Sequence, residues 1–193
     1  MSSLADREKT LLLDVVRRSV ALAAQNAEPL PESSLPSDEV LLQPGGAFVT
    51  LRIRGRLRGC IGQLASGIAL VRVVAYCARA SALEDPRFDP VRPEEVPQID
   101  IELSILSEPV DIAPDLVEPG RHGLIVSRGA QRGLLLPQVA SEFRWSARRF
   151  LEETCGKAGM EPSAWKDPAT KVQVFTAEVF SESGLPAAKS NAM

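Results

Sequence analysis

The strongest constraint on the fold of this chain is a strand–turn–strand pattern between residues 47 and 61. Apolar and polar side chains alternate through residues 47–54, Gly55 follows, and residues 56–61 lead away from it. Alternation with a period of two is typical of a strand with one buried face, and a glycine between two such segments is typical of a tight turn. We therefore predict an antiparallel hairpin.

Other periodic segments add helices and strands on both sides of this hairpin. Helical spacing of apolar residues predicts three helices, over residues 4–26, 68–85 and 147–155. Alternation predicts two strands and a second hairpin, over residues 99–106, 171–180 and 122–137. Ser66 and Ser146 are the expected N-caps of the second and third helices, and Ile68 is expected to open the buried face of the second. Strands joined by hairpins favour a mixed or antiparallel sheet, so the predicted fold class is α+β.

The size and composition fit a soluble globular protein. The chain has 193 residues, of which 45 % are apolar and 24 % charged, and its net charge is −3. These values exclude disorder of the whole chain and give no global attraction to nucleic acid or anionic membrane. No apolar run approaches the roughly 20 residues that span a bilayer, and residues 1–9 are too polar for a secretory signal, so we expect no membrane association. Residues 183–193 are expected to form a flexible tail, and residues 190–193 resemble a remnant of recombinant expression.

The histidine and cysteine content restricts the available chemistry. The chain has one histidine and three cysteines, and the cysteines form no C-x-x-C pair. A closed tetrahedral zinc site would need Cys60, Cys77, Cys155 and His122 together, so we predict no metal site. An odd number of scattered cysteines suits a reducing cytoplasm, which is the predicted location.

Residues 57–62 carry the first candidate site, a cysteine with glycines on both sides of it. Glycines allow the backbone to turn sharply and to approach a ligand closely. Strand alternation places Arg56, Arg58 and Cys60 on one face and Leu57 on the other, and nearby guanidinium charge favours the thiolate. Backbone N–H groups in the following loop and helix start are suited to an anion. The alternative is that Cys60 is a small packing residue in a tight hairpin.

His122 is the second candidate. It lies between Arg121 and Gly123 at the entrance to a predicted strand. Because imidazole titrates near neutral pH, the ring is suited to act as an acid or a base. The alternative is that the ring hydrogen-bonds a neighbouring carbonyl and orders the turn.

The third candidate is the segment 84–88, Glu-Asp-Pro-Arg-Phe, at the end of the second predicted helix. Carboxylates at a helix C-terminus oppose the helix dipole, so Glu84 and Asp85 should have a partner. A general base or a metal-binding carboxylate is one interpretation. A structural ion network with Arg87 is the other.

Nucleic-acid binding and several enzyme classes receive little support. Four arginines at alternate positions between residues 52 and 58 form a positive strip, but no aromatic residues interleave with them to stack bases. We expect them to form a solvated sheet face, with acids such as Glu102 as partners. The chain lacks the phosphate-loop, dinucleotide, nucleophile-elbow and zinc-protease motifs.

Six segments together resemble the AMMECR domain family, named after the AMME syndrome candidate gene product. They are residues 48–51, 57–62, 84–88, 120–126, 133–140 and 175–180. They occur in the family's order over most of residues 5–182, and the R-G-C-I-G and L-L-P-Q segments are specific when found together. The resemblance implies one α+β domain over residues 5–182, with two unequal lobes around a cleft.

The resemblance implies a context but no reaction and no cofactor, because the family's biochemical activity is not established. Members often occur beside, or fused to, Memo-like and radical-SAM proteins, which implies a shared pathway with RNA or nucleobase modification among the proposals. The R-G-C-I-G segment is the family's suspected functional site. The ligand-binding candidates are therefore Arg58, Gly59, Gly62, Arg87 and Arg121.

These observations lead to a working hypothesis of an enzyme, or the catalytic accessory of one, for a small anionic or nucleobase-like substrate. Cys60 is its nucleophile, His122 its acid or base, and Glu84 or Asp85 its orienting carboxylate. Two alternatives stay open. One is a non-catalytic adaptor that binds Memo-like or radical-SAM partners, and the other is an RNA-binding module that uses the arginine strip.

Overall fold

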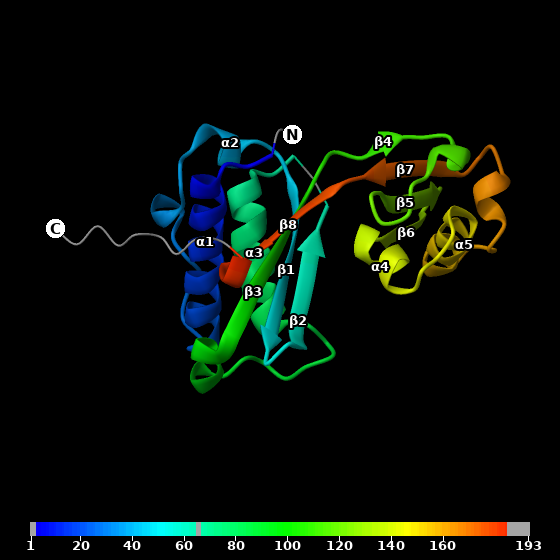
Figure 1. Cartoon of the computed structure of the whole chain (residues 1–193). Coiled ribbons are helices and arrows are strands. Elements are labelled where there is room, and N and C mark those ends of the chain that lie inside the picture. Colours follow the sequence, from blue (N-terminus) through cyan, green and yellow to red (C-terminus); the bar gives the residue numbers. More distant parts are fainter. Residues whose placement is uncertain (1–2, 65–66, 185–193) are drawn as a thin grey trace. The chain divides into compact units, whose positions relative to one another are not determined.

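A computed structural model describes residues 3–64 and 67–184 of the chain (Figure 1). The chain divides into two compact units. The first unit combines Met1–Leu106 with Glu178–Met193, and the second is Ser107–Ala177. Ser66 and most of the predicted tail, residues 185–193, lie outside the described residues.

The first unit is a four-stranded sheet with two long helices on one face. The strand order is β2-β1-β3-β8, and its strands are β1 (Gly46–Ile53), β2 (Arg56–Gln63), β3 (Ile99–Leu106) and β8 (Ala177–Ser181). β1 pairs antiparallel with both β2 and β3. The helices α1 (Asp6–Ala24) and α3 (Leu70–Leu83) run side by side against the sheet (Figure 1).

The buried face of this sheet is the alternating set predicted from the sequence. Val49, Leu51, Ile101 and Leu103 are fully buried and belong to one core with the apolar faces of α1 and α3. The β1–β2 turn has two residues, Arg54 and Gly55, with φ of +51° and +76°. Positive φ at both positions is the geometry that two-residue hairpins require, and glycine adopts it without strain. The predicted first hairpin is therefore confirmed.

The proline-rich connection between α1 and β1 has short helical turns of its own. These are η1 (Glu32–Ser34) and α2 (Glu39–Leu42), and Leu41 of α2 is fully buried. α3 begins at Leu70, so Ile68 precedes the helix and is 42 % exposed, contrary to the prediction. The remaining short turns are η2 (Pro93–Gln98), η3 (Pro114–Leu116), η4 (Ala164–Lys166) and η5 (Glu182–Gly184).

The second unit has its own sheet and its own core. Its strand order is β4-β7-β5-β6, with β4 (Val110–Asp111), β5 (Gly123–Arg128), β6 (Gln131–Leu135) and β7 (Lys171–Phe175). The helices are α4 (Pro137–Glu142) and α5 (Ala147–Lys157). Ser146 caps α5 as predicted, since its hydroxyl accepts the Arg149 N–H at 3.3 Å. Phe150 and Leu151 of α5 belong to one buried core with Leu124 of β5 and Val174 of β7.

The last predicted strand, residues 171–180, is two strands in two different sheets. It breaks at Thr176, whose N–H donates to Ser107 Oγ and whose carbonyl accepts the Ser107 N–H, both at 2.9 Å. β7 then pairs in the second unit and β8 in the first. The predicted α+β class is confirmed, whereas the cleft stays a prediction. No helix in the described part of the chain has the length and apolar character needed to cross a membrane.

Candidate functional site

A β-bulge sets the direction of the Cys60 side chain. β1 pairs Arg52 with Leu57 and Leu51 with Gly59, so Arg58 is an extra residue on β2. One inserted residue shifts the alternation, and the following side chains move to the opposite face. Cys60 pairs with Thr50 and therefore shares a face with Leu57, on the side of the sheet away from α3. The predicted division of faces was wrong, because the bulge interrupts the period of two.

The two glycines beside Cys60 allow close packing on opposite sides of the strand. A β-carbon on Gly59 would lie 2.1 Å from the Ser81 carbonyl oxygen of α3. A β-carbon on Gly62 would lie 2.1 Å from the Phe48 ring. Gly59 brings the helix close to the strand, and Gly62 makes room for an aromatic ring on the face that carries Cys60.

Hydrogen bonds from side chains fix the backbone around Cys60. Its N–H donates to Asp85 Oδ2 at 2.8 Å, and the Ile61 N–H donates to Ser81 Oγ at 2.9 Å. Ser81 in turn donates to the Val49 carbonyl at 2.9 Å. The Thr50 hydroxyl donates to the half-buried Cys60 sulfur at 3.4 Å. The thiol is thus held on a rigid strand rather than on a loop.

Asp85 links the end of α3 to this strand. Its side chain is 3 % exposed and also accepts three hydrogen bonds from Arg87, one from the backbone N–H and two from the guanidinium. The hydrogen bonds from the Arg87 side chain lower the pKa of Asp85 well below its ordinary range, against the opposing effect of burial. A carboxylate with so low a proton affinity is poorly suited as a general base. It is suited to orient the Cys60 backbone and Arg87.

Arg87, rather than Arg58, is the arginine beside Cys60. Its Nη2 lies 3.4 Å from the Cys60 carbonyl oxygen, and 54 % of its side chain is exposed. Arg58 is instead paired through two nitrogens with Glu95, at 2.9 and 3.0 Å, and donates to the backbone carbonyls of residues 89 and 90. The Phe88 ring lies near both guanidinium groups, at 6.0 Å from Arg58 and 5.5 Å from Arg87.

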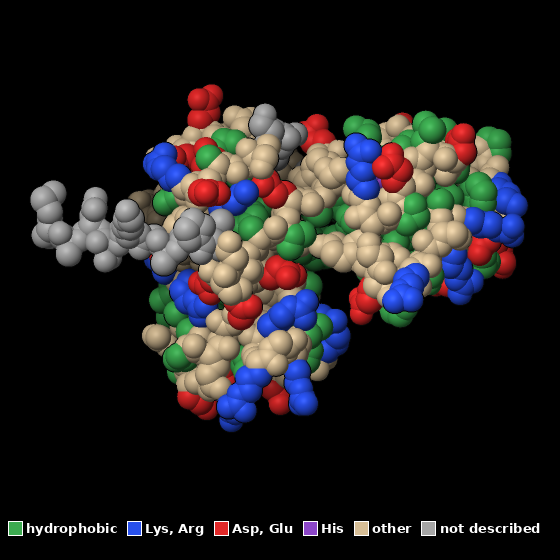
Figure 2. All heavy atoms as spheres, viewed as in Figure 1, with side chains coloured by type: hydrophobic (Ala, Val, Ile, Leu, Met, Phe, Trp, Pro, Cys, Tyr) green, Lys and Arg blue, Asp and Glu red, His purple; other side chains and the backbone are tan. Residues whose placement is uncertain are grey.

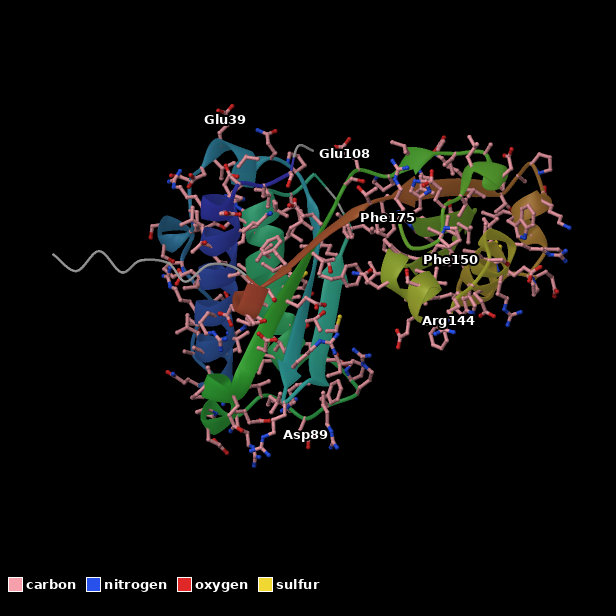
Figure 3. All side chains as sticks on the ribbon, in the orientation of Figure 1. Glu39, Asp89, Glu108, Arg144, Phe150 and Phe175 are labelled. Atoms are coloured by element: carbon pink, nitrogen blue, oxygen red, sulfur yellow. The ribbon has the colours of Figure 1, made fainter. Side chains whose placement is uncertain are left out.

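These arginines border a hollow of about 480 Å³ beside the loop that follows α3. Asp89 lies on this loop, at the end of the first unit that carries the β1–β2 turn (Figure 3). At the same end, Lys and Arg side chains gather with acidic side chains among them (Figure 2). Arg52 and Glu102 are both partly exposed, and Arg52 Nη2 lies 4.0 Å from Glu102 Oε1, as expected for a solvated sheet face. The charge here is largely paired.

The Arg58–Glu95 pair leads to a testable pH dependence. The Arg58 hydrogen bonds lower the pKa of Glu95 from 4.5 to about 2, so the pair stabilises the fold fully above the unfolded-state pKa and loses this effect as the pH falls towards 2. We expect Glu95→Gln to cost about 2 kcal/mol at pH 7, with a smaller difference from the parent protein as the pH falls below about 4.5. Urea unfolding between pH 7 and 3 measures this. Glu94→Gln, at an exposed neighbour, is the control, and a difference independent of pH would contradict the assignment.

Glu84 is exposed at the C-terminus of α3, and its backbone N–H donates to the Ala80 carbonyl at 2.7 Å. Of the two predicted carboxylates, Asp85 alone makes a side-chain hydrogen bond among the described residues. No group of three or more His, Cys, Asp or Glu side chains in residues 3–64 and 67–184 is arranged to hold a metal ion.

His122 and Arg121 belong to the second unit, whereas Cys60, Asp85 and Arg87 belong to the first. His122 is 8 % exposed, and its Nδ1 accepts the Glu118 N–H at 3.1 Å. The neutral ring therefore carries its proton on Nε2. Arg121 pairs with the Glu118 carboxylate at 3.0 Å. Their side-chain hydrogen bonds in the described structure stay within this turn, so His122 orders it by accepting an N–H rather than by binding a carbonyl.

Three residues that position the site were not predicted: Thr50, Ser81 and Glu95. Ser81 had a visible signal, because it is a polar residue within the apolar stripe of a helix, where a buried hydroxyl needs a partner. Thr50 and Glu95 had none, since their contacts depend on the strand register and on the path of a loop.

The fold and this site define a class: a two-sheet α+β protein with an unpaired cysteine between glycines on a bulged edge strand. A family model described as AMMECR1 matches residues 13–180, so the chain belongs to the AMMECR1 family. A protein from Methanothermobacter thermautotrophicus is 46 % identical over 159 residues, 78 % of this chain and 83 % of that protein. A protein from Thermococcus gammatolerans is 40 % identical over 195 residues, 94 % of each chain.

A solved structure has the same fold. The crystal structure of uncharacterized protein PH0010 from Pyrococcus horikoshii matches with a TM-score of 0.78 and 39 % identity. The match covers 90 % of this chain and 91 % of that one. The family recognised from the sequence motifs is therefore confirmed.

Proposed function

We propose that the first unit carries out thiol chemistry on a small anionic or nucleobase-like substrate, with Cys60 as the nucleophile. One observation carries the proposal: a half-buried thiol that accepts a hydrogen bond from Thr50 stands on a rigid strand beside Arg87, a guanidinium that is half exposed. Sulfur is an intrinsically strong nucleophile, and the half-buried position of the Cys60 side chain leaves it accessible to a substrate.

In the proposed step, the Cys60 sulfur forms a bond to an electrophilic carbon of the substrate. The bond from that carbon to its leaving group breaks, and the leaving group departs with the electron pair. The thiol proton passes to water. Arg87 binds the negative charge, Asp85 positions Arg87 and the Cys60 backbone, and Glu84 remains the second candidate for the orienting carboxylate.

The exposure of the three cysteines predicts selective labelling. Cys77 and Cys155 are fully buried, and burial raises the pKa of the Cys77 thiol to about 12 and that of Cys155 above its usual value. We expect iodoacetamide to modify one cysteine in the native protein, with no labelling after Cys60→Ala. Intact-protein mass spectrometry measures the stoichiometry, and labelling of Cys77 or Cys155 at a similar rate would contradict it.

The charge of the alkylating reagent tests the role of Arg87. Iodoacetate is an anion and iodoacetamide is neutral, so the ratio of their alkylation rates reports how strongly a thiol's surroundings attract negative charge. If Arg87 attracts anions to Cys60, this ratio should be about threefold to tenfold higher for Cys60 than for the free thiol of glutathione. Arg87→Met should remove this excess, and Arg72→Met, at an exposed arginine of α3 outside the hollow, should keep it. A ratio equal to that of glutathione would favour an adaptor without an anion site.

The alternatives make different predictions. An adaptor for Memo-like or radical-SAM proteins needs no reactive thiol, so Cys60→Ala would preserve its binding. An RNA-binding module requires an affinity that falls steeply with salt, and absence of RNA binding at low salt would dismiss it. We also propose that the protein acts in one pathway with Memo-like and radical-SAM proteins, which its family membership supports. A reducing cytoplasm is the proposed location, and three unpaired cysteines support it.

A further inference from the structure

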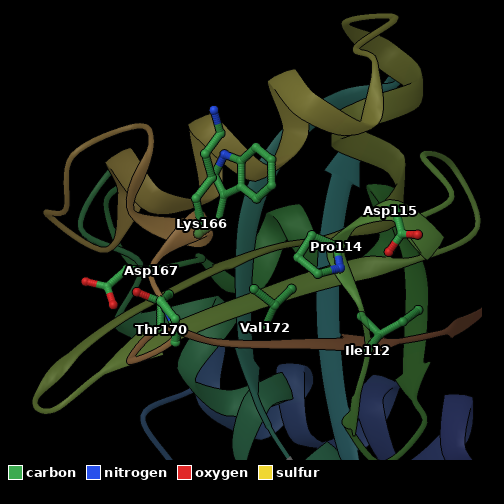
Figure 4. Close-up of a pocket in the computed structure, with 9 residues that line it drawn as sticks. Ile112, Pro114, Asp115, Lys166, Asp167, Thr170 and Val172 are labelled. Atoms are coloured by element: carbon green, nitrogen blue, oxygen red, sulfur yellow. The ribbon is translucent and has the colours of Figure 1, made fainter.

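The second unit contains a hollow of about 510 Å³ that the proposed chemistry does not use (Figure 4). Its apolar lining comes from Ile112, Pro114, Pro168 and Val172. Ligand sites for small molecules usually have about 300–1,000 Å³ and combine apolar walls with a few polar groups. This hollow has the volume and the walls of such a site.

Two polar atoms of the lining residues have no hydrogen-bond partner. They are the indole Nε1–H of Trp165 and the hydroxyl of Thr170, a residue that is only 8 % exposed. Only three buried side-chain atoms in the described residues are unpaired in this way, and two of them belong to this one lining. Buried polar groups are nearly always paired, so an orphaned donor beside a hollow indicates a missing acceptor.

The same lining carries a positive charge, that of Lys166, which also interacts electrostatically with Glu152 of α5. Lys166 Nζ lies 5.3 Å from the centre of the Trp165 ring, and no carboxylate in the described structure forms a salt bridge with it. The neighbouring Asp167 is already bound, to Arg128 at 3.1 Å and to the Ala169 N–H at 2.9 Å. Asp115, on the opposite side of the hollow from Lys166 (Figure 4), is an exposed carboxylate.

We infer that this hollow binds a small monocarboxylate with an apolar body. The carboxylate would pair with Lys166 and, after a small rotation of the lining side chains, accept hydrogen bonds from Trp165 Nε1 and Thr170 Oγ1. The apolar body would lie against Pro114 and Val172. Repulsion from Asp115 increases with the charge of the ligand, so a single negative charge is favoured over phosphate.

The test uses tryptophan fluorescence and four probes. The chain has two tryptophans, so Trp145→Phe leaves Trp165 as the only reporter. The probes are 4-methylpentanoate, its neutral amide, 3-methylbutylamine and inorganic phosphate. We expect saturable binding of 4-methylpentanoate, at least about tenfold weaker binding of the amide, and none of the amine or phosphate.

Variants in the Trp145→Phe background identify the groups involved. Lys166→Met should weaken binding at least about tenfold, and Thr170→Val about threefold to tenfold. Thr170→Val should not lower the melting temperature, because it removes an unpaired buried hydroxyl. Lys157→Met, an exposed lysine on α5 outside the hollow, is the control. The inference is overturned if no probe saturates below about 50 mM, if the amide or amine binds as tightly, or if both lining variants bind like the control.

Discussion

Replacing Gly59 with alanine should destabilise the protein by about 4 kcal/mol or abolish folding of the first unit. The added β-carbon would lie 2.1 Å from the Ser81 carbonyl oxygen, a distance that no side-chain rotation relieves because the oxygen belongs to the backbone of α3. Either the helix moves away from the sheet or the strand bends, and both separate fully buried side chains such as Leu51 and Val74. Overpacking of this kind produces the large effects seen for single substitutions. Urea unfolding followed by circular dichroism measures the loss.

The same substitution at Gly156 is the matched control. A β-carbon there meets nothing within 4 Å, and the position lies inside α5, where alanine is the better helix former. We expect Gly156→Ala to leave stability unchanged or to raise it by up to about 1 kcal/mol. If Gly59→Ala were as stable as Gly156→Ala, the close approach of β2 to α3 would be wrong. Close packing would then not explain why a glycine precedes Cys60.

The elements that the sequence specifies locally were predictable. Ile99–Leu106 forms a strand because its apolar residues alternate without interruption, and α5 begins after Ser146 because a serine precedes the first helical turn. The hairpin around Gly55 was equally clear, since few residue types adopt positive φ at a two-residue turn. In each case the signal lies within one short segment.

The bulge at Arg58 was not predictable, because it depends on how β2 pairs with β1 rather than on the residues of β2 alone. An extra residue on one strand leaves the residue types unchanged and shifts only the register, so the alternation before and after it looks continuous. The consequence was large, since it moved Leu57 to the face of Cys60. The break of the last strand at Thr176 has a similar origin, in its pairing with Ser107.

The candidate site was predictable as a set of segments but not as a set of contacts. Cys60, Asp85 and Arg87 were each identified from their motifs, and the structure joins them through hydrogen bonds across 25 residues of sequence. Proximity in sequence predicts Arg58 as the partner of the thiol. Glu95 instead binds that guanidinium, because the loop after α3 returns along the edge strand.

Removing the Asp85 carboxylate should have the second largest effect on stability. Asp85→Ala leaves the Cys60 N–H without an acceptor and Arg87 without its partner, and we expect a loss of about 3 kcal/mol at pH 7. Because the folded-state pKa of Asp85 is depressed, its contribution is complete above the unfolded value of 3.8 and is lost as the pH falls below it. The difference between the variant and the parent protein should therefore shrink towards acidic pH in urea unfolding.

A second measurement separates this role from a general effect on packing. If Asp85 positions the Cys60 backbone, Asp85→Ala should also change the iodoacetamide rate at Cys60 by several-fold, in a protein that circular dichroism still finds folded. Asp89→Ala is the control, since Asp89 is an exposed residue of the same loop whose backbone carbonyl, not its carboxylate, binds Arg58. An unchanged alkylation rate in Asp85→Ala would mean that the carboxylate stabilises the loop alone, and the link between the segment at residues 84–88 and the thiol would be lost. A change in rate with no counterpart in Asp89→Ala would tie the reactivity of Cys60 to the Asp85 carboxylate, which binds both the Cys60 N–H and Arg87.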